Sequence, residues 1–284
     1  MPPMSILEAI LLGIVQGLTE FLPISSSGHL ILVPWLQDYR FLIENEDFNK
    51  TFDVALHFGT LIAVVWYFRA DLARMASGVM RTLRTRAIRD ADERLGWVVV
   101  IGTIPAVIAG GLGEDWIDEY LGEPWMIGIL LIAFGLLLGY ADRRPQREDI
   151  EHVTLRHGVI IGVAQALALS PGVSRSGVTI TAGRFLGLTR DAAARVSFLL
   201  LMPATAGAVV FKGVQSAMDG LPDGVVGPMI AGTIASAIAG YLAIAGLLAL
   251  VRRHSYDAFV VYRVAVGIAI LLVIAADLRP ATFG

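Results

Sequence analysis

Cysteine is absent from the sequence, which excludes disulfide bonds, thiolate metal sites and cysteine nucleophiles. Charge is also scarce: only 17% of the residues are Asp, Glu, Lys or Arg, and Lys50 and Lys212 are the only two lysines. The chain has no G-x-x-x-x-G-K-S/T phosphate loop, which argues against nucleotide hydrolysis. We expect no nucleic-acid partner.

Hydrophobic residues are abundant instead. They make up 56% of the chain, above the roughly 45–50% of soluble domains, and the mean hydropathy is +0.69. Five stretches carry no charged residue, namely 95–113, 124–141, 224–251 and the shorter 54–68 and 196–211. About 20 apolar residues cross a bilayer as a helix. The sequence therefore predicts an all-α integral membrane protein, one domain over residues 1–284 with about six transmembrane helices.

The loop charges predict how the chain is oriented. Residues 69–94 carry seven arginines against four acids, and the turn after Val251 opens with two more arginines, which the positive-inside rule places in the cytoplasm. Residues 113–123 hold five acids and no basic residue, which fits an external loop. The first basic residue is Arg40, so we expect no removable signal peptide.

Two polar segments are variants of one motif. Gly13–His29 reads G-I-V-Q-G-L-T-E-F-L-P-I-S-S-S-G-H, and Gly162–Val178 reads G-V-A-Q-A-L-A-L-S-P-G-V-S-R-S-G-V. At an offset of 149 they share Gly, Gln, Ser, Ser and Gly, whereas Glu20, His29 and Arg175 each occur in one copy only. Polar groups at two related places in so apolar a chain predict one composite site at a repeat interface.

Proline and glycine interrupt both copies. Pro23 precedes three serines and a glycine, and Pro171 and Gly172 interrupt the second copy. Because the loop charges leave an even number of crossings at each motif, we expect two re-entrant helical hairpins that enter from opposite sides. Gly102–Gly110 also matches Gly232–Gly240. We therefore expect an inverted repeat, with repeat one at about 1–112, repeat two at about 124–251 and a final transmembrane helix at about 258–277.

The residue types in these motifs suit a phosphate group. A guanidinium offers a planar fork of donors and successive backbone amides form an anion nest, which makes Arg175 and its neighbours a candidate phosphate site. Glu20 and Gln16 are candidate ligands of a divalent cation, Mg²⁺ or Ca²⁺, because hard cations take carboxylate and amide oxygens. The candidate phosphate-binding hydroxyls belong to both copies: Ser25, Ser27, Ser174, Ser176 and Thr179.

Together the motifs Q-G-L-T-E-F-L-P-I-S-S-S-G-H and P-G-V-S-R-S-G-V-T resemble those of the bacterial undecaprenyl pyrophosphate phosphatase family, which is known for bacitracin resistance. The resemblance covers nearly the whole chain in motif order, hydropathy and length. It implies an inverted-repeat membrane fold and removal of the terminal phosphate from a prenyl pyrophosphate lipid. It also implies that the product is the monophosphate carrier lipid for peptidoglycan synthesis and that the protein lies in the bacterial plasma membrane. Because the loop charges place the entry of the first hairpin outside, we expect the active site to face the periplasm or exterior.

The same resemblance implies the catalytic residues Glu20, Ser26, His29 and Arg175. Family members often carry Glu where this chain has Gln16, so Glu20 is the sole anionic candidate within this motif. Two routes stay open: attack by Ser26 with His29 moving protons, or attack by a water that a metal or Glu20 activates. Asp53 and His57, one helical turn apart, are candidates for the polar cavity, and Arg263 is expected to be a structural partner.

Two other functions compete with this interpretation. A second family of membrane lipid phosphatases has a P-S-G-H and S-R-x5-H signature, but here Thr181 stands where that signature requires histidine. An inverted-repeat transporter or flippase for a lipid phosphate would share the architecture, and fold analogy does not separate it from an enzyme. Small residues on the helix faces also permit a homodimer.

Overall fold

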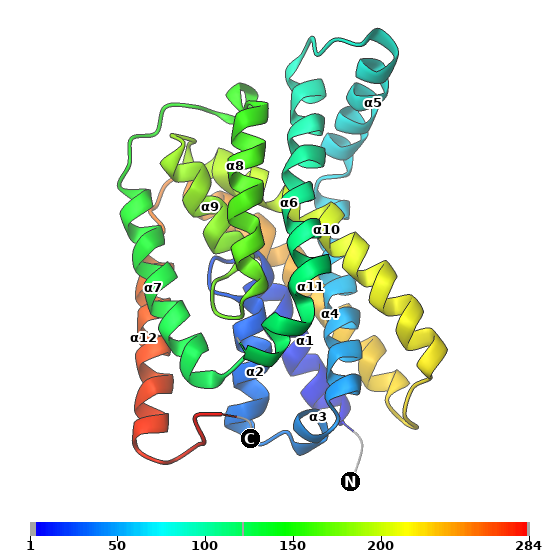
Figure 1. The fold of residues 1–284 in the computed structure, drawn as a ribbon, viewed down its shortest axis with the longest axis vertical. Helices are drawn as coiled ribbons and strands as arrows, with labels where there is room; N and C mark the ends of the chain where they lie inside the picture. Colours follow the sequence, from blue (N-terminus) through cyan, green and yellow to red (C-terminus); the bar gives the residue numbers. More distant parts are fainter. Residues whose placement is uncertain (1–3, 121, 283–284) are drawn as a thin grey trace.

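Helices are the only regular secondary structure among the described residues. The computed structural model describes residues 4–120 and 122–282, apart from the side chains of 46, 113–120 and 215–219. Within these ranges there are twelve α-helices and no β-strand, which confirms the expected all-α fold (Figure 1). The helices are α1 Ile6–Phe21, α2 Ser26–Gln37, α3 Arg40–Glu44, α4 Glu46–Tyr67, α5 Arg69–Thr85, α6 Ala91–Tyr120, α7 Pro124–Asp142, α8 Leu155–Ala166, α9 Arg175–Phe185, α10 Arg190–Asp219, α11 Val226–Val251 and α12 Asp257–Ala275.

Five or six crossings account for the apolar stretches. Among the described residues, α6, α7, α10, α11 and α12 are each long and apolar enough to span a bilayer. The pair α4 and α5, which bend by 78° at the break between Tyr67 and Arg69, gives a sixth if the two helices count as one broken span. The protein is therefore a multi-pass membrane protein with five or six spans over the described residues, in line with the about six that the sequence predicts.

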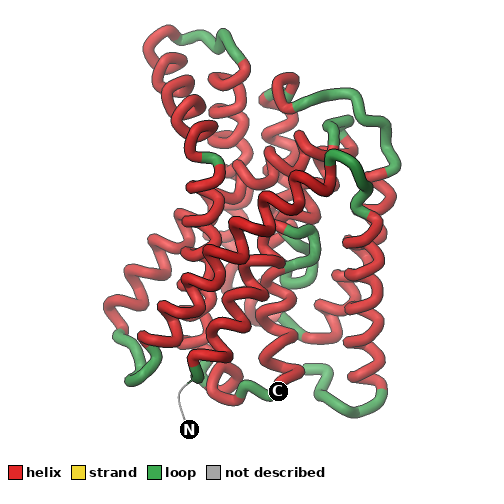
Figure 2. Tube along the Cα trace, turned by 180° about the vertical axis from the view of Figure 1, so that it is seen from behind, coloured by secondary structure: helices red, strands yellow, loops and turns green. Residues whose placement is uncertain are grey.

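Both polar motifs fold as helical hairpins that turn back inside the molecule. In the first copy α1 ends at Phe21 and α2 starts at Ser26, and in the second α8 ends at Ala166, followed by a short 3-10 turn before α9 starts at Arg175. The loops that join these helices lie within the helical body and not at its ends (Figure 2). Non-helical backbone at this depth is tolerated because protein surrounds it.

The order of elements repeats in inverted form. A hairpin, α1 and α2, is followed by three spans, and a second hairpin, α8 and α9, is followed by α10, α11 and α12. The first hairpin enters from the lower end in Figure 1 and the second from the upper end. This order favours a boundary between α7 and α8, later than the boundaries near residues 112 and 124 that the sequence predicts.

The arginine-rich connections lie together at one end of the molecule. The segments that join α5 to α6 and α7 to α8 are both at the top of Figure 1. Buried Asp142 at the end of α7 accepts from Arg184 and from Arg190, whose Nε lies 2.7 Å from its Oδ1, so the base of the second hairpin is fixed at this end. At the opposite end α6 continues to Tyr120, so most of the stretch expected to be an external loop is helix; residue 121 lies outside the described residues.

Glycine pairs allow the two halves to pack alike. A Cβ at Gly13 of α1 would lie 2.2 Å from the carbonyl oxygen of Gly232 on α11, and a Cβ at Gly162 of α8 would lie 2.3 Å from that of Gly102 on α6. In each repeat the first glycine of the motif therefore packs against a glycine on a spanning helix of the other repeat. Close backbone approach is a common means of holding membrane helices together, since lipid supplies no hydrophobic driving force between them.

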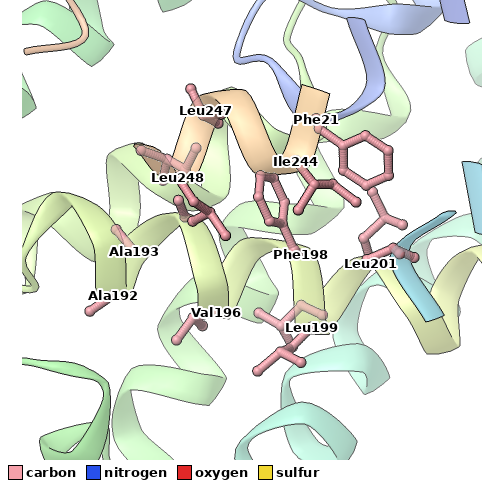
Figure 3. Packing of buried hydrophobic residues seen from close by; sticks show 14 of the residues in the cluster. Phe21, Ala192, Ala193, Val196, Phe198, Leu199, Leu201, Ile244, Leu247 and Leu248 are labelled. Carbon is pink, nitrogen blue, oxygen red and sulfur yellow. The ribbon is translucent and has the colours of Figure 1, made fainter. Parts of the chain in front are cut away.

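The apolar core lies where the first hairpin meets the second half. Phe21, the last residue of α1, is fully buried and contacts the ring of Phe198 on α10 edge-on, with ring centres 5.3 Å apart. Ile244 and Leu247 of α11 complete this contact (Figure 3). The core thus anchors the end of α1 immediately before the polar motif.

Replacing the paired glycines should weaken the fold. We expect Gly13→Ala and Gly162→Ala each to destabilise the protein by about 1–3 kcal/mol, because the added methyl group overlaps a backbone oxygen. Gly207→Ala is the matched control, since no atom lies within 4 Å of a Cβ built there. Thermal unfolding in detergent measures the effect, and midpoints equal to that of the Gly207 variant would contradict the assigned packing.

Candidate active site

A serine in an unusual backbone conformation starts the helix after each break. Ser25 and Ser174 both have φ of 76°, a value that L residues rarely adopt. Each hydroxyl oxygen accepts from the backbone N–H three residues later, that of Gly28 or Gly177. This N-cap lets α2 and α9 start at the hairpin tips, and helix N-termini favour anions.

The two tips bind each other directly. The Gly172 N–H donates to Ser25 Oγ at 3.1 Å, and Ser176 Oγ donates to the Leu22 carbonyl at 2.9 Å. Arg263 of α12, fully buried, donates to the carbonyls of Pro23 in the first tip and of Gly172 and Val173 in the second, at 2.9–3.2 Å. Arg263 therefore has the structural role expected of it.

Glu20 lies at the centre of a cluster drawn from four helices. Its side chain is 3% exposed, and its Oε2 accepts from Ser26 Oγ at 2.5 Å and from Gln16 Nε2 at 3.0 Å. His57 Nε2 of α4 lies 3.5 Å from the same oxygen, and Arg175 Nη1 of α9 lies 3.7 Å from Oε1. The structure thus brings Glu20, Ser26 and Arg175, one carboxylate, one hydroxyl and one guanidinium, to a single place from both repeats.

A cavity opens beside this cluster. It has a volume of about 550 Å³, and its wall includes Ser27, His57, Arg175 and Thr205. Arg175 Nη1 donates to Thr205 Oγ1 of α10 at 2.6 Å, which orients the guanidinium in the cavity wall. The cavity therefore presents the Arg175 guanidinium and the Ser27 side chain, groups suited to an anion, next to the cluster that holds Ser26.

His29 has a different environment from the one that the sequence suggests. Its Nδ1 lies 2.6 Å from the Ser25 carbonyl, so it donates there, and its Nε2 lies 2.8 Å from the Tyr262 hydroxyl on α12. Both ring nitrogens are therefore engaged away from Ser26. The geometry does not support proton transfer between Ser26 and His29, because the Ser26 hydroxyl donates to Glu20 instead.

Most of the predicted phosphate-binding hydroxyls lie inside the protein. Ser25, Ser174 and Ser176 are at most 3% exposed and bond within or between the tips, and Thr179 Oγ1 lies 2.7 Å from the Arg175 carbonyl. These positions favour a role in holding the backbone over direct contact with phosphate. Ser27 differs, because it lines the cavity.

The proposed cation ligands offer two oxygens. Gln16 Oε1 and Glu20 Oε1 are both buried without a hydrogen-bond partner. Over the residues whose positions are described, no group of three or more His, Cys, Asp or Glu side chains is arranged for a metal. Gln16 and Glu20 fit a hard cation that takes its remaining ligands from water and phosphate oxygens, as Mg²⁺ commonly does.

Two further residues of the site come from α4 and α10. The sequence singles out His57 through its one-turn spacing from Asp53, but it does not pair His57 with Glu20. Thr205 lies in an apolar stretch 30 residues after Arg175 and carries no signal that links them. Only the packing of α10 against α9 reveals that contact.

Comparison with known proteins places this chain in a family. The model of the family described as bacitracin resistance protein BacA matches residues 9–269. A protein of Geobacter sulfurreducens named undecaprenyl-diphosphatase is 50% identical over 94% of this chain and 98% of its own length. Proteins of the same name from Pelobacter propionicus and Thermomicrobium roseum are each 45% identical over 95% of this chain and 98% and 99% of theirs. The chain therefore belongs to the BacA family of bacitracin resistance proteins.

Proposed function

We propose that this protein hydrolyses undecaprenyl diphosphate to undecaprenyl phosphate and inorganic phosphate, and so recycles the carrier lipid for cell-wall synthesis. The names of its relatives support this substrate. The observation that carries the proposal is the contact of the Ser26 hydroxyl with the Glu20 carboxylate beside Arg175. A hydroxyl paired with a base and placed next to a fixed guanidinium is suited to phosphoryl transfer.

In the first step Ser26 Oγ attacks the terminal phosphorus. A bond forms between Oγ and phosphorus, the bond from phosphorus to the bridging oxygen breaks, and the prenyl phosphate leaves with that electron pair. Glu20, whose Oε2 already accepts from Ser26, takes the serine proton. Arg175 stabilises the charge on the transferring phosphoryl oxygens, and the N-termini of α2 and α9 add a favourable field.

In the second step a water hydrolyses the phosphoserine. The water oxygen bonds to phosphorus, the bond from phosphorus to Ser26 Oγ breaks, and inorganic phosphate is released. Before this step Glu20 releases the serine proton to the departing prenyl phosphate or to solvent; it then accepts a proton from the attacking water and passes it to Ser26 Oγ as that oxygen leaves. The alternative is a single displacement by a water that Glu20 activates, in which Ser26 only holds a phosphate oxygen.

We also propose that Gln16 and Glu20 hold a divalent cation, Mg²⁺ or Ca²⁺, when substrate is bound. The support is the pair of buried oxygens without hydrogen-bond partners, Gln16 Oε1 and Glu20 Oε1, and the need to neutralise a diphosphate. Such a cation would supply charge neutralisation to the phosphate oxygens. It would leave the attack by Ser26 and the orienting role of Thr205 as described.

For its place in the cell we propose the bacterial plasma membrane, with the cavity facing the periplasm or exterior. The positive-inside rule puts the arginine-rich end in the cytoplasm, and the first hairpin enters from the opposite end. A homodimer stays a prediction from the small-residue helix faces, and the site is assembled within one chain.

The proposed reaction can be tested with purified protein in detergent. Phosphate release from a prenyl diphosphate is expected for the parent and would be absent for a transporter. We expect Ser26→Ala and Glu20→Gln each to lower the rate by about a thousandfold or more, because attack or its base is lost. Ser77→Ala on exposed α5 is the control and should keep full activity. Substantial activity in Ser26→Ala, with no phosphoenzyme trapped in the parent, would decide for the water route.

Removal of divalent cations tests the proposed ligands. Dialysis of the parent against a chelator should lower phosphate release as severely as Glu20→Gln does, and Mg²⁺ or Ca²⁺ should restore it. The readout is the rate before and after the cation is returned at fixed ionic strength. A chelator without effect would eliminate the cation and leave Glu20 as a base alone.

The native absence of cysteine makes the orientation measurable. Ile43→Cys lies in the cavity wall at the first-hairpin end, and Arg86→Cys lies at the arginine-rich end. In intact cells an impermeant thiol reagent should label the Ile43 variant, whereas the Arg86 variant should react only after the membrane is opened. The reverse pattern would invert the proposed topology.

A further inference from the structure

The cavity continues outward from the Glu20 cluster along two helices. His57 of α4 and Thr205 of α10 line the part of the cavity nearest the cluster. His57 contacts Glu20, and Thr205 contacts Arg175. Lys50 lies seven residues before His57 and Lys212 seven residues after Thr205, and both lysines line the same cavity. Seven residues are two helical turns, about 10 Å, and return to the same helix face.

The two lysines add a second pair of positive charges to the cavity wall, farther from the Glu20 cluster. They are the only lysines in the chain, whose other 20 basic residues are arginines. Because α4 runs toward the arginine-rich end and α10 runs away from it, Lys50 and Lys212 lie at the same end of the molecule (Figure 1). Lysine carries a compact charge on a flexible stem, which suits an anion that moves past it better than a fixed fork does.

Acidic groups accompany these lysines. Asp53, one turn from Lys50, has Lys212 and His57 as its charged neighbours, and Glu123 also lines the cavity. Carboxylates in the wall favour ammonium groups that face the cavity over ones that extend to the lipid surface. A doubly charged phosphate can then compete for the same ammonium groups when it enters.

We propose that Lys50 and Lys212 form a second phosphate-binding site, two helical turns along α4 and α10 from His57 and Thr205. The phosphate comes either from the second phosphate of the lipid diphosphate or from inorganic phosphate on its way out. This inference rests on the proposed reaction for its role, although the binding of phosphate does not depend on turnover. Asp53 positions Lys212 and takes no part in the chemistry.

The test compares a Lys50→Gln/Lys212→Gln double variant with the parent and with a Lys50→Arg/Lys212→Arg variant that keeps both charges. Three quantities are measured: KM for a prenyl diphosphate, the inhibition constant of inorganic phosphate, and the calorimetric Kd of inorganic phosphate without substrate. We expect the glutamine pair to raise KM or the phosphate constants by about tenfold, the loss of roughly one charged hydrogen bond, while kcat changes less. The arginine pair should stay within about threefold of the parent.

The two phosphate sources give different results. A rise in KM alone assigns the site to the lipid-borne phosphate, and a rise in the two phosphate constants alone assigns it to the released product. Arg40→Gln is the matched control, since it removes an exposed charge at the first-hairpin end outside the cavity wall. The proposal is overturned if all three constants of the glutamine pair stay within twofold of the parent, or if Arg40→Gln changes them equally. A parent that releases no phosphate would refute the proposed reaction, while the calorimetric comparison would still decide the lysine site.

Discussion

Broken backbone in the middle of a membrane protein must find hydrogen-bond partners within the protein, and the architecture depends on how this chain supplies them. Each hairpin tip frees carbonyl groups that no water of the bilayer interior can satisfy. Arg263 supplies most of these hydrogen bonds, because its guanidinium donates from α12 to carbonyls of both tips. Ser25 and Ser176 add one bond from each hairpin to the other. The two tips are therefore one structural unit, although they come from opposite sides of the membrane.

This unit explains how a duplicated motif yields an asymmetric site. At the repeat offset of 149, Ser26 corresponds to Arg175, and each is the first residue of its helix after a serine with φ of 76°. One copy thus places a hydroxyl, the proposed nucleophile, where the other places a guanidinium. Glu20 corresponds to Leu169, so only one half carries the carboxylate that we propose as the base. The backbone strain at Ser25 and Ser174, about 1–3 kcal/mol each, accompanies the turns that direct Ser26 and Arg175 toward one point.

Much of this arrangement could be predicted from the sequence, because charge inside an apolar chain is rare. Glu20 and Arg175 stand out for that reason, and the proline and glycine breaks predict the hairpins. The directions of side chains could not be predicted. The sequence places His29 beside Ser26, but three residues along α2 bring its ring to Tyr262 on α12. The contacts of Thr205 with Arg175 and of His57 with Glu20 join helices that are distant in the sequence, and no pattern in the sequence pairs these residues.

In the proposed reaction one carboxylate from the first hairpin and one guanidinium from the second act on the same phosphate. A double-mutant cycle on kcat/KM tests it most directly, with Glu20→Gln, Arg175→Lys and the double variant measured on one prenyl diphosphate. If both residues serve one transition state, the double variant should lose little more activity than the worse single variant, a coupling of more than about 1 kcal/mol. Losses that simply multiply would contradict the account, because they would mean that the two residues act independently.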